Sequence, residues 1–253
     1  MLRPRIICSL LLDNGDLVKT KSFEDGIYIG DPLNTIRIFN EMKVDEIMIM
    51  DINAYSESSI NFTLLEKIAS VSLMPICYGG GIRNIKQIEH LLSFGIEKIS
   101  LNSILFEDKN FHIFQDAIKF FGSQSISICV DIKKIDGKYY SCNKNFEKQI
   151  DLENHLRNLQ LYNPGEIIIH SIDREGHMNG YDETLIDSII KYIEVPLTIL
   201  GGASSIDDII KLSKNYKISG YSCGSIFCFK QKRGTVLLNY FKNIDKQKLA
   251  KIF

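Results

Sequence analysis

The chain has 253 residues, of which 45% are hydrophobic and 24% charged, and its formal net charge is -1. That length can bury the core of one large α/β domain, and the balanced charge provides no basic field for nucleic acid or a membrane surface. No apolar stretch approaches the roughly 20 residues of a membrane span, and no charged segment leads into a short apolar one as in a secretory signal. We therefore expect a cytoplasmic protein with neither a nucleic acid nor a membrane as partner.

Short apolar runs rich in β-branched residues recur along the whole chain and are too short for helices. They predict strands at residues 5–11, 46–52, 74–78, 98–101, 125–132, 166–172, 196–200 and 220–223. Segments with helical apolar spacing lie between them, at residues 31–42, 84–95 and 204–214 among others. Pro32 stands near the start of the first of these helices, and Asn84 and Gly95 are typical of the two ends of the second.

This alternation of strand and helix predicts the fold. Continuous apolar strands are buried on both faces, which favours a parallel sheet, and eight strand–helix units in about 250 residues match a TIM barrel. We therefore expect a single (β/α)8 domain over residues 1–253. The alternative is an open, doubly wound sheet, but no G-x-G-x-x-G motif follows the first strand.

An internal repeat favours the closed barrel. The same number of residues separates Asp51 from Asp173, Gly80 from Gly202, and Ser103 from Ser225. The repeat predicts two similar half-barrels, at about residues 1–122 and 123–253.

Two glycine clusters predict anion sites. Gly79–Gly81 follows the third strand and Gly201–Gly202 the seventh, and each leads into a helix. The next strand of each half ends in Asn102–Ser103 or in Gly224–Ser225. Backbone amides at such turns and helix starts bind phosphate, so the pair predicts a ligand with a phosphate at each end, or a site whose second cluster serves another use. The alternative is that the glycines only turn the chain.

Three acids at strand ends, Asp51, Asp131 and Asp173, are candidates for the site, because this fold builds its chemistry at the carboxyl ends of its strands. Asp131 closes the apolar run SISICV and is the strongest candidate for a general acid or base; a helix cap or a loop ion pair is the alternative. Lys19, expected in the loop after the first strand, could neutralise substrate charge or be solvated. His170 and His177 flank Asp173 and are expected to be structural.

Four charged residues stand at the opposite ends of the strands. Arg5, Glu46, Lys98 and Glu166 begin the first, second, fourth and sixth strands, so they could form a charged ring across the barrel floor; a solvated rim is the alternative. The six cysteines contain no C-x-x-C pair and are expected to be reduced, buried thiols. The sequence therefore predicts no metal and no cofactor.

Several motifs, in order and over nearly the whole chain, resemble those of one family. These are LVKTKSFE, IGDP, MDI, YGGGIRNI, VDIKK, SIDREG followed by GYD, and LGGASS. Together they resemble the cyclase subunit of imidazole glycerol phosphate synthase. That resemblance implies a barrel that binds a bis-phosphorylated ribonucleotide at its top and receives ammonia from a glutaminase docked on its bottom.

The resemblance also assigns roles to residues of this chain. It implies that Gly81, Asn102 and Ser103 hold one phosphate, and Gly176, Gly202, Gly224 and Ser225 the other. It implies that Asp131 is catalytic. Lys19, Asp51 and Asp173, candidates from their positions in the sequence, are expected to bind the substrate. It makes Arg5, Glu46, Lys98 and Glu166 the gate through which ammonia enters.

One departure from the family changes the expected function. The family's first strand ends in a catalytic aspartate, and Leu11 stands at that position here; Asp13 would serve only if the strand were locally shifted. The runs LLL-x-x-G-x-LVKT and CGSIFCFK, with VLLNY after it, resemble the glycosyl amidation-associated branch. That branch implies a glutaminase partner and a separate amidotransferase that modifies a nucleotide-linked sugar for a surface glycan.

Two rival functions remain open. The chain could be an authentic cyclase and lyase of histidine biosynthesis, using Asp131 alone or with Asp13; Leu11 argues against this. It could be a catalytically silent scaffold that activates its glutaminase; the retained Asp131 and both phosphate sites argue against that. We expect an enzyme subunit of the cyclase and lyase family that lacks the aspartate of the first strand.

Overall fold

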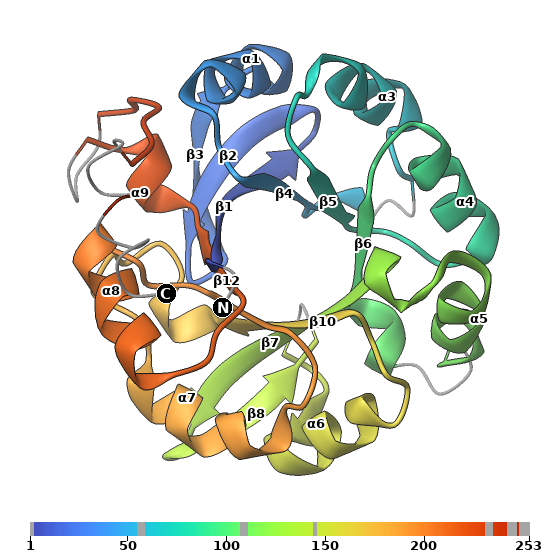
Figure 1. The fold of residues 1–253 in the computed structure, drawn as a ribbon, viewed down its shortest axis with the longest axis vertical. Coiled ribbons are helices and arrows are strands. Elements are labelled where there is room, and N and C mark those ends of the chain that lie inside the picture. The colour runs from blue at the N-terminus through green and yellow to red at the C-terminus, as the bar shows by residue number, and fades with distance from the viewer. Residues whose placement is uncertain are drawn as a thin grey trace.

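Parallel strands close into a barrel that is wrapped by helices (Figure 1). The computed structural model describes residues 3–54, 59–106, 111–143, 146–230, 235–241 and 247. Within these residues the strands pair in the ring order β1, β4, β5, β6, β7, β10, β11, β12 and back to β1. The predicted (β/α)8 barrel is therefore confirmed.

The barrel strands occur where the apolar runs predicted them. They are β1 (Arg5–Asp13), β4 (Glu46–Asp51), β5 (Ile76–Gly79), β6 (Lys98–Leu101), β7 (Ile126–Ile135), β10 (Glu166–Ser171), β11 (Leu197–Leu200) and β12 (Gly220–Cys223). The helices are α1 (Pro32–Met42), α3 (Phe62–Val71), α4 (Ile85–Ser93), α5 (Phe111–Phe121), α6 (Leu152–Gln160), α7 (Glu183–Ile189), α8 (Ile206–Asn215) and α9 (Ser225–Cys228). None of the helices in the described residues is long and apolar enough to cross a membrane.

Local signals fix where the helices begin. The Asp31 side chain accepts from the Asn34 amide, and Pro32 opens α1 because it has no amide hydrogen to leave unpaired. Asn84 and Gln87 form a reciprocal capping box at the start of α4. Gly95, just past the end of α4, has a φ of +96°, which a residue with a side chain rarely adopts. The predicted ends of this helix are thus confirmed.

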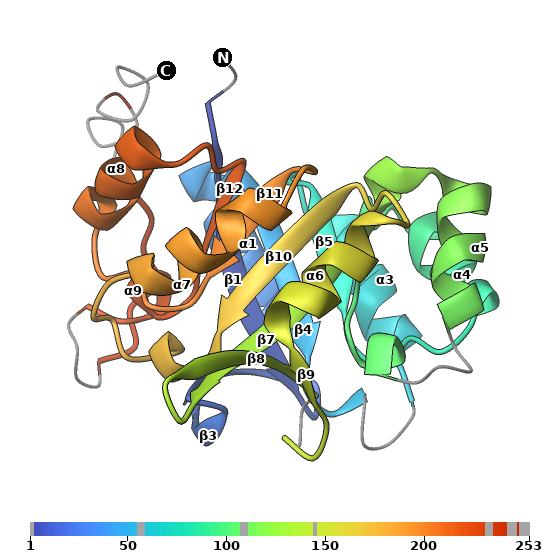
Figure 2. The ribbon, with the colours of Figure 1, turned by 90° about the horizontal axis from the view of Figure 1, so that it is seen from below.

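Two antiparallel hairpins were not predicted. β2 (Asp16–Lys21) and β3 (Glu24–Gly30) follow β1, while β8 (Lys138–Cys142) and β9 (Gln149–Asp151) follow β7. Both extend from the end of the barrel opposite to the start of β1 (Figure 2). The elaborated strands are the first of each predicted half, which agrees with the internal repeat, although the division near residue 122 stays a prediction.

The alternation of side chains along each strand arranges the barrel interior in layers. Arg5, Ile7, Ser9 and Leu11 follow one another at every second residue of β1, so they line the interior from its floor to its mouth. The same spacing stacks Glu46 below Met48 on β4, and Glu166 below Ile168 and His170 on β10. From the floor to the mouth, the barrel interior is therefore lined first by charged, then by apolar, and then by mixed polar and apolar side chains.

The chain segment after α9 crosses back over the start of β1. The Tyr240 hydroxyl donates to the Ile6 carbonyl at 3.1 Å and accepts from the Asp45 amide at 3.4 Å. Its ring lies 5.0 Å from that of Phe227, between centroids. Residues close to the end of the described chain therefore fasten the first strand to the loop before β4.

All six cysteines are buried and free of disulfides, as predicted. A less expected buried group is His155 on α6, which is only 5% exposed. Neither of its ring nitrogens has a hydrogen-bond partner among the described residues. Burial alone lowers the pKa of His155 to about 4.

We expect His155 to make the fold sensitive to mild acid. The unfolded chain takes up a proton below about pH 6.5, whereas the folded chain resists it until about pH 4, so stability is lost as the pH falls through this window. At pH 5 the loss should be about 2 kcal/mol. Urea unfolding at pH 7 and pH 5 measures this loss of stability, and His155→Leu should remove it.

His112 provides the matched control, because it lies exposed on α5. His112→Leu should leave the difference between pH 7 and pH 5 unchanged. An equal loss of stability at pH 5 in the wild type and in His155→Leu would contradict the assignment.

Candidate functional site

A closed ring of ion pairs lies at the floor of the barrel. Lys98 Nζ lies 2.7 Å from Glu166 and 3.2 Å from Glu46, and Arg5 pairs with both carboxylates from the other side. Glu46 and Glu166 are only 4% and 3% exposed. Of the two alternatives, the structure therefore shows the ring and not the solvated rim, while the role of these residues as a gate stays a prediction. We call Arg5, Glu46, Lys98 and Glu166 the charged ring.

The ring favours the charged forms of Lys98 and Glu166. Burial would lower the pKa of Lys98, but the attraction of Glu166 and Glu46 outweighs it and raises the pKa. Burial would likewise raise the pKa of Glu166, yet Lys98 and Arg5 hold it below its usual value. Thr198 also donates its hydroxyl hydrogen to Glu166. Each charge in the ring therefore depends on its neighbours for stabilisation.

An apolar layer lies directly above the ring. It consists of Ile7, Met48, Cys77, Cys129, Ile168 and Leu200. Three of these side chains come two residues after a member of the ring on the same strand, so they stack on it inside the barrel. The layer separates the charges of the floor from the other end of the barrel.

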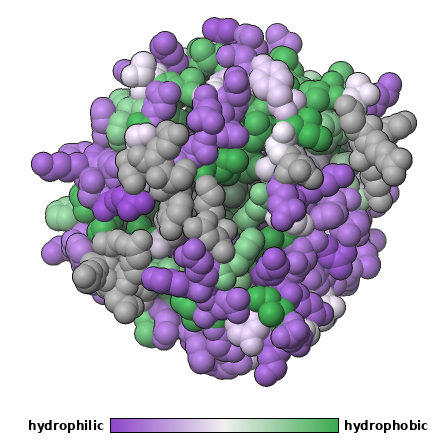
Figure 3. Space-filling model, turned by 180° about the vertical axis from the view of Figure 1, so that it is seen from behind, coloured by the Kyte–Doolittle hydropathy of each residue, from purple (hydrophilic) through white to green (hydrophobic). Residues whose placement is uncertain are grey.

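At the carboxyl ends of the strands the barrel opens into the mouth cavity, of about 370 Å³. The molecular face opposite to that of Figure 1 is hollowed near its centre, with hydrophobic side chains inside a mostly hydrophilic surround (Figure 3). Gly81, Asn102 and Ser103, predicted to hold one phosphate, all line this cavity together with Asp51 and Asp131. Gly81 has a φ of +66°, and a Cβ there would lie 2.6 Å from the Ala54 carbonyl oxygen.

A second, smaller hollow of about 30 Å³ adjoins the first. The residues predicted to hold the other phosphate all line it, namely Gly176, Gly202, Gly224 and Ser225. Lys19 lines it as well. The expected position of Lys19 in a loop was wrong, and so was the alternative that it is solvated: it lies on β2, is 4% exposed, and donates to the Ser9 carbonyl at 2.7 Å. The hairpin of β2 and β3, which was not predicted, buries Lys19 beside the hollow.

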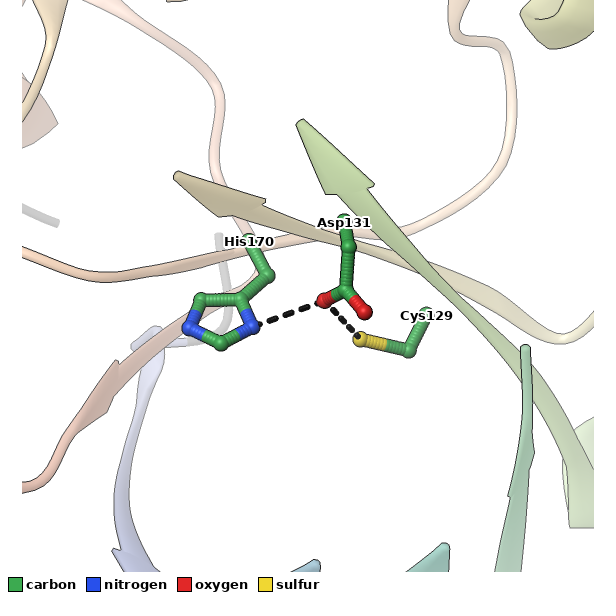
Figure 4. Close-up of side chains that lie close together, drawn as sticks. All are labelled: Cys129, Asp131 and His170. Carbon is green, nitrogen blue, oxygen red and sulfur yellow. Dashed lines mark hydrogen bonds and ion pairs between the residues drawn. The ribbon is translucent and has the colours of Figure 1, made fainter. Parts of the chain in front are cut away.

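Asp131 lies within a cluster of side chains that the sequence did not predict. His170 Nδ1 lies 2.9 Å from Asp131 Oδ1, and Cys129 Sγ lies 4.0 Å from the same oxygen (Figure 4). Asn102 Nδ2 donates to the other carboxylate oxygen at 2.6 Å. His170 was expected to be structural, yet it contacts the strongest catalytic candidate. Only the pairing of β7 with β10 reveals this contact.

Leu11 occupies the position between the two hollows. It is 5% exposed and lines both of them. Asp13 lines neither: its carboxylate accepts from the Asn53 amide group and, at 3.2 Å, from that of Asn14. The first strand therefore presents a leucine to the mouth of the barrel, and Asp13 is held away from it.

The structure separates one other candidate, Asp173, from the hollows. Asp173 is exposed and accepts from the Lys134 amide at 2.8 Å, and it lines neither hollow. Its substrate-binding role stays a prediction.

Asp51 lines the mouth cavity while its carboxylate accepts from the Ala54 amide at 2.9 Å and the Tyr78 hydroxyl at 3.3 Å. It therefore shapes the loop after β4. His177, also exposed, lies 3.0 Å from the Ser22 hydroxyl.

Fold and site together define a (β/α)8 barrel with two adjoining hollows at its mouth and a charged ring at its floor. A profile of the family described as histidine biosynthesis protein matches residues 5–233. The chain belongs to this family, and within it to the cyclase subunits of the imidazole glycerol phosphate synthase type.

Relatives cover almost the whole chain. A Vibrio vulnificus protein, provisionally named a subunit of imidazole glycerol phosphate synthase, is 40% identical over 257 residues, or 100% of this chain and 98% of that protein. A Leptospira interrogans protein with the same provisional name is 41% identical over 254 residues, or 98% and 99% of the two chains. The imidazole glycerol phosphate synthase subunit HisF of a Hydrogenobaculum species is 32% identical over 246 residues, or 96% and 97%.

Proposed function

We propose that this chain receives ammonia from a glutaminase subunit and supports the amidation of a nucleotide-linked sugar for a surface glycan. The observation that carries the proposal is the order of features along the barrel. The charged ring closes the floor, the apolar layer follows, and the mouth cavity lies at the other end. A barrel built in this order can take in a small molecule at one end and release it at the other.

The apolar layer favours ammonia over ammonium ion. A neutral molecule gives up little on leaving water, whereas a buried cation without a partner loses several kcal/mol of hydration. Glutamine hydrolysis within a docked partner would deliver ammonia directly to the ring. The layer would then keep it unprotonated on its way to the mouth cavity.

Leu11 supports a role other than the family's ring-closing chemistry. A leucine can neither donate nor accept a proton, so the first strand presents no general acid–base group to the mouth. Asp131 and both hollows are retained, which supports a phosphorylated ligand at the mouth. The pyrophosphate of a nucleotide-linked sugar carries the anionic oxygens that the glycine turns and Lys19 could bind.

A nitrogen-tracing experiment tests the proposal. The complex should be purified from its source cells on a tag fused to this chain, then given glutamine labelled with ¹⁵N in its amide. A nucleotide-linked N-acetyl sugar, ATP and excess unlabelled ammonium should be present. We expect the amidated sugar to carry mostly ¹⁵N, because the channelled ammonia does not mix with the bulk pool.

The charged ring supplies the matched variants. Lys98→Met with Glu46→Gln removes one cation and one anion together, and it should shift the product toward unlabelled nitrogen. Arg157→Ala removes an exposed cation on α6 and should retain the label. A complex without glutaminase activity, or equal labelling in the ring variant, would count against the proposal.

The histidine-biosynthetic cyclase is the second candidate. The retention of Asp131 and of both hollows at the mouth favours it. The two functions differ in what they require of position 11, and a substitution there separates them.

A further inference from the structure

Three potential metal ligands meet where β7 pairs with β10. The strand register sets His170 directly opposite Asp131, and Cys129 precedes Asp131 by two residues, so all three side chains project from the same face (Figure 4). They are buried, with exposures of 6% for Cys129, 7% for Asp131 and 1% for His170. One donor atom from each lies within 4.8 Å of the other two.

We propose that Cys129, Asp131 and His170 bind one divalent metal ion, best matched by Zn²⁺, with a fourth position open to the mouth cavity. A thiolate, an imidazole and a carboxylate together suit Zn²⁺, whereas Mg²⁺ and Ca²⁺ prefer oxygen ligands. Three protein ligands with one open position are the pattern of zinc sites that bind a water or a substrate. This proposal does not depend on the proposed function.

The geometry allows the ion with small movements. Tetrahedral Zn²⁺ with ordinary bond lengths sets its donor atoms roughly 3.3–3.6 Å apart. The observed separations of 2.9 Å from Nδ1 to Oδ1 and 4.0 Å from Sγ to Oδ1 bracket that range. Each of these two separations would have to change by about half an ångström to admit the ion. Its charge would be balanced by the thiolate and the carboxylate.

The surroundings of the cluster fit a metal as well. Asn102 fixes one oxygen of Asp131 at 2.6 Å, so that the other is directed at His170 and Cys129. His170 Nε2 is buried without a hydrogen-bond partner among the described residues, and His170 lines the second hollow. An ion on Nδ1 would fix the proton on Nε2, which could then donate to an anion in that hollow. A metal on Nδ1 would thereby give the buried, unpartnered His170 Nε2 a role as a hydrogen-bond donor.

Access to the open position comes from the mouth. Cys129 and Asp131 both line the cavity of about 370 Å³, which has room for a water or a ligand atom on the ion. The apolar layer, to which Cys129 also belongs, shields the other side. A bound metal would therefore face the same space as the predicted phosphate site.

Metal titration of the purified full chain tests the site. The protein is stripped with a chelator under reducing conditions and titrated with Zn²⁺, and in parallel with Co²⁺ as a coloured probe. We expect saturation at one equivalent and, for Co²⁺, a near-ultraviolet band from thiolate-to-metal charge transfer. Cys129→Ser should abolish that band and weaken Zn²⁺ binding by about 100-fold or more. His170→Asn should weaken Zn²⁺ binding similarly.

Cys77→Ser is the matched control, because Cys77 is also buried in the apolar layer but lies outside the cluster. It should retain both the band and the affinity. A band that persists in Cys129→Ser, or no saturable binding by the wild type, would overturn the proposal. If Cys129→Ser does not fold, unchanged Zn²⁺ affinity in a folded His170→Asn protein would overturn it equally.

Discussion

Replacing Lys98 by methionine should lower the free energy of unfolding by about 3 kcal/mol, because it leaves Glu46 and Glu166 buried with only Arg5 to balance them. The aliphatic part of the lysine side chain is kept, so the loss reports charge rather than volume. Urea unfolding at neutral pH measures it. The difference from the wild type should shrink as the pH falls and the unpaired carboxylates take up protons.

Two comparisons isolate the charge effect. Adding Glu46→Gln to Lys98→Met should restore part of the stability, since Arg5 and Glu166 then form one balanced pair. Arg157→Met removes a cation from an exposed pair with Glu153 and should leave the unfolding midpoint nearly unchanged. Equal midpoints for Lys98→Met and the wild type would show that the ring contributes no net stability.

The second large effect is expected at Leu11. If Leu11 occupies the place of the family's catalytic aspartate, Leu11→Asp should raise cyclase turnover of the histidine-pathway ribonucleotide with free ammonia by about 100-fold. Asp131 and both hollows already line the space beside position 11, so one absent proton-transfer group can dominate the defect. The recovery should be incomplete, because the side chains around position 11 are arranged about a leucine and not about a carboxylate.

Leu11→Asn is the control, because it adds a polar group of the same size that cannot transfer a proton at neutral pH. It should turn over no faster than the unmodified chain. Rescue of a histidine auxotroph by the unmodified chain at ordinary expression would show that the leucine is no obstacle. The histidine-biosynthetic function would then replace the proposed one.

The barrel was predictable because its signals are local. Continuous apolar runs mark strands that are buried on both faces, and caps such as Asn84 mark the helix starts. The position of the four ring residues at one end was predictable for the same reason, since each stands at the start of a strand and parallel strands begin at one end. That pattern fits a solvated rim equally, and only the family resemblance favoured the ring. What the sequence could not show is that Lys98 touches both glutamates while Arg5 closes the ring from the other side.

The contacts of Asp131 were not predictable, because they depend on the register between two strands that are distant in the chain. A shift of one residue would turn His170 away from Asp131 and outward from the barrel. The hairpin after β1 was missed because its short run LVKT was interpreted as a loop, and the burial of Lys19 was missed with it. The absence of a metal motif likewise predicted no metal, since Cys129 and His170 show no ligand spacing along the sequence.

The fastening of the first strand by Tyr240 has a consequence for synthesis on the ribosome. β1 emerges first, yet its partner β12 and the tyrosine that bridges Ile6 and Asp45 emerge among the last residues described. Until then one edge of β1 has no strand to pair with, and an unpaired apolar edge invites association with other chains. The nascent barrel therefore stays open until β12 and Tyr240 have been synthesised, and only then is the unpaired edge of β1 covered.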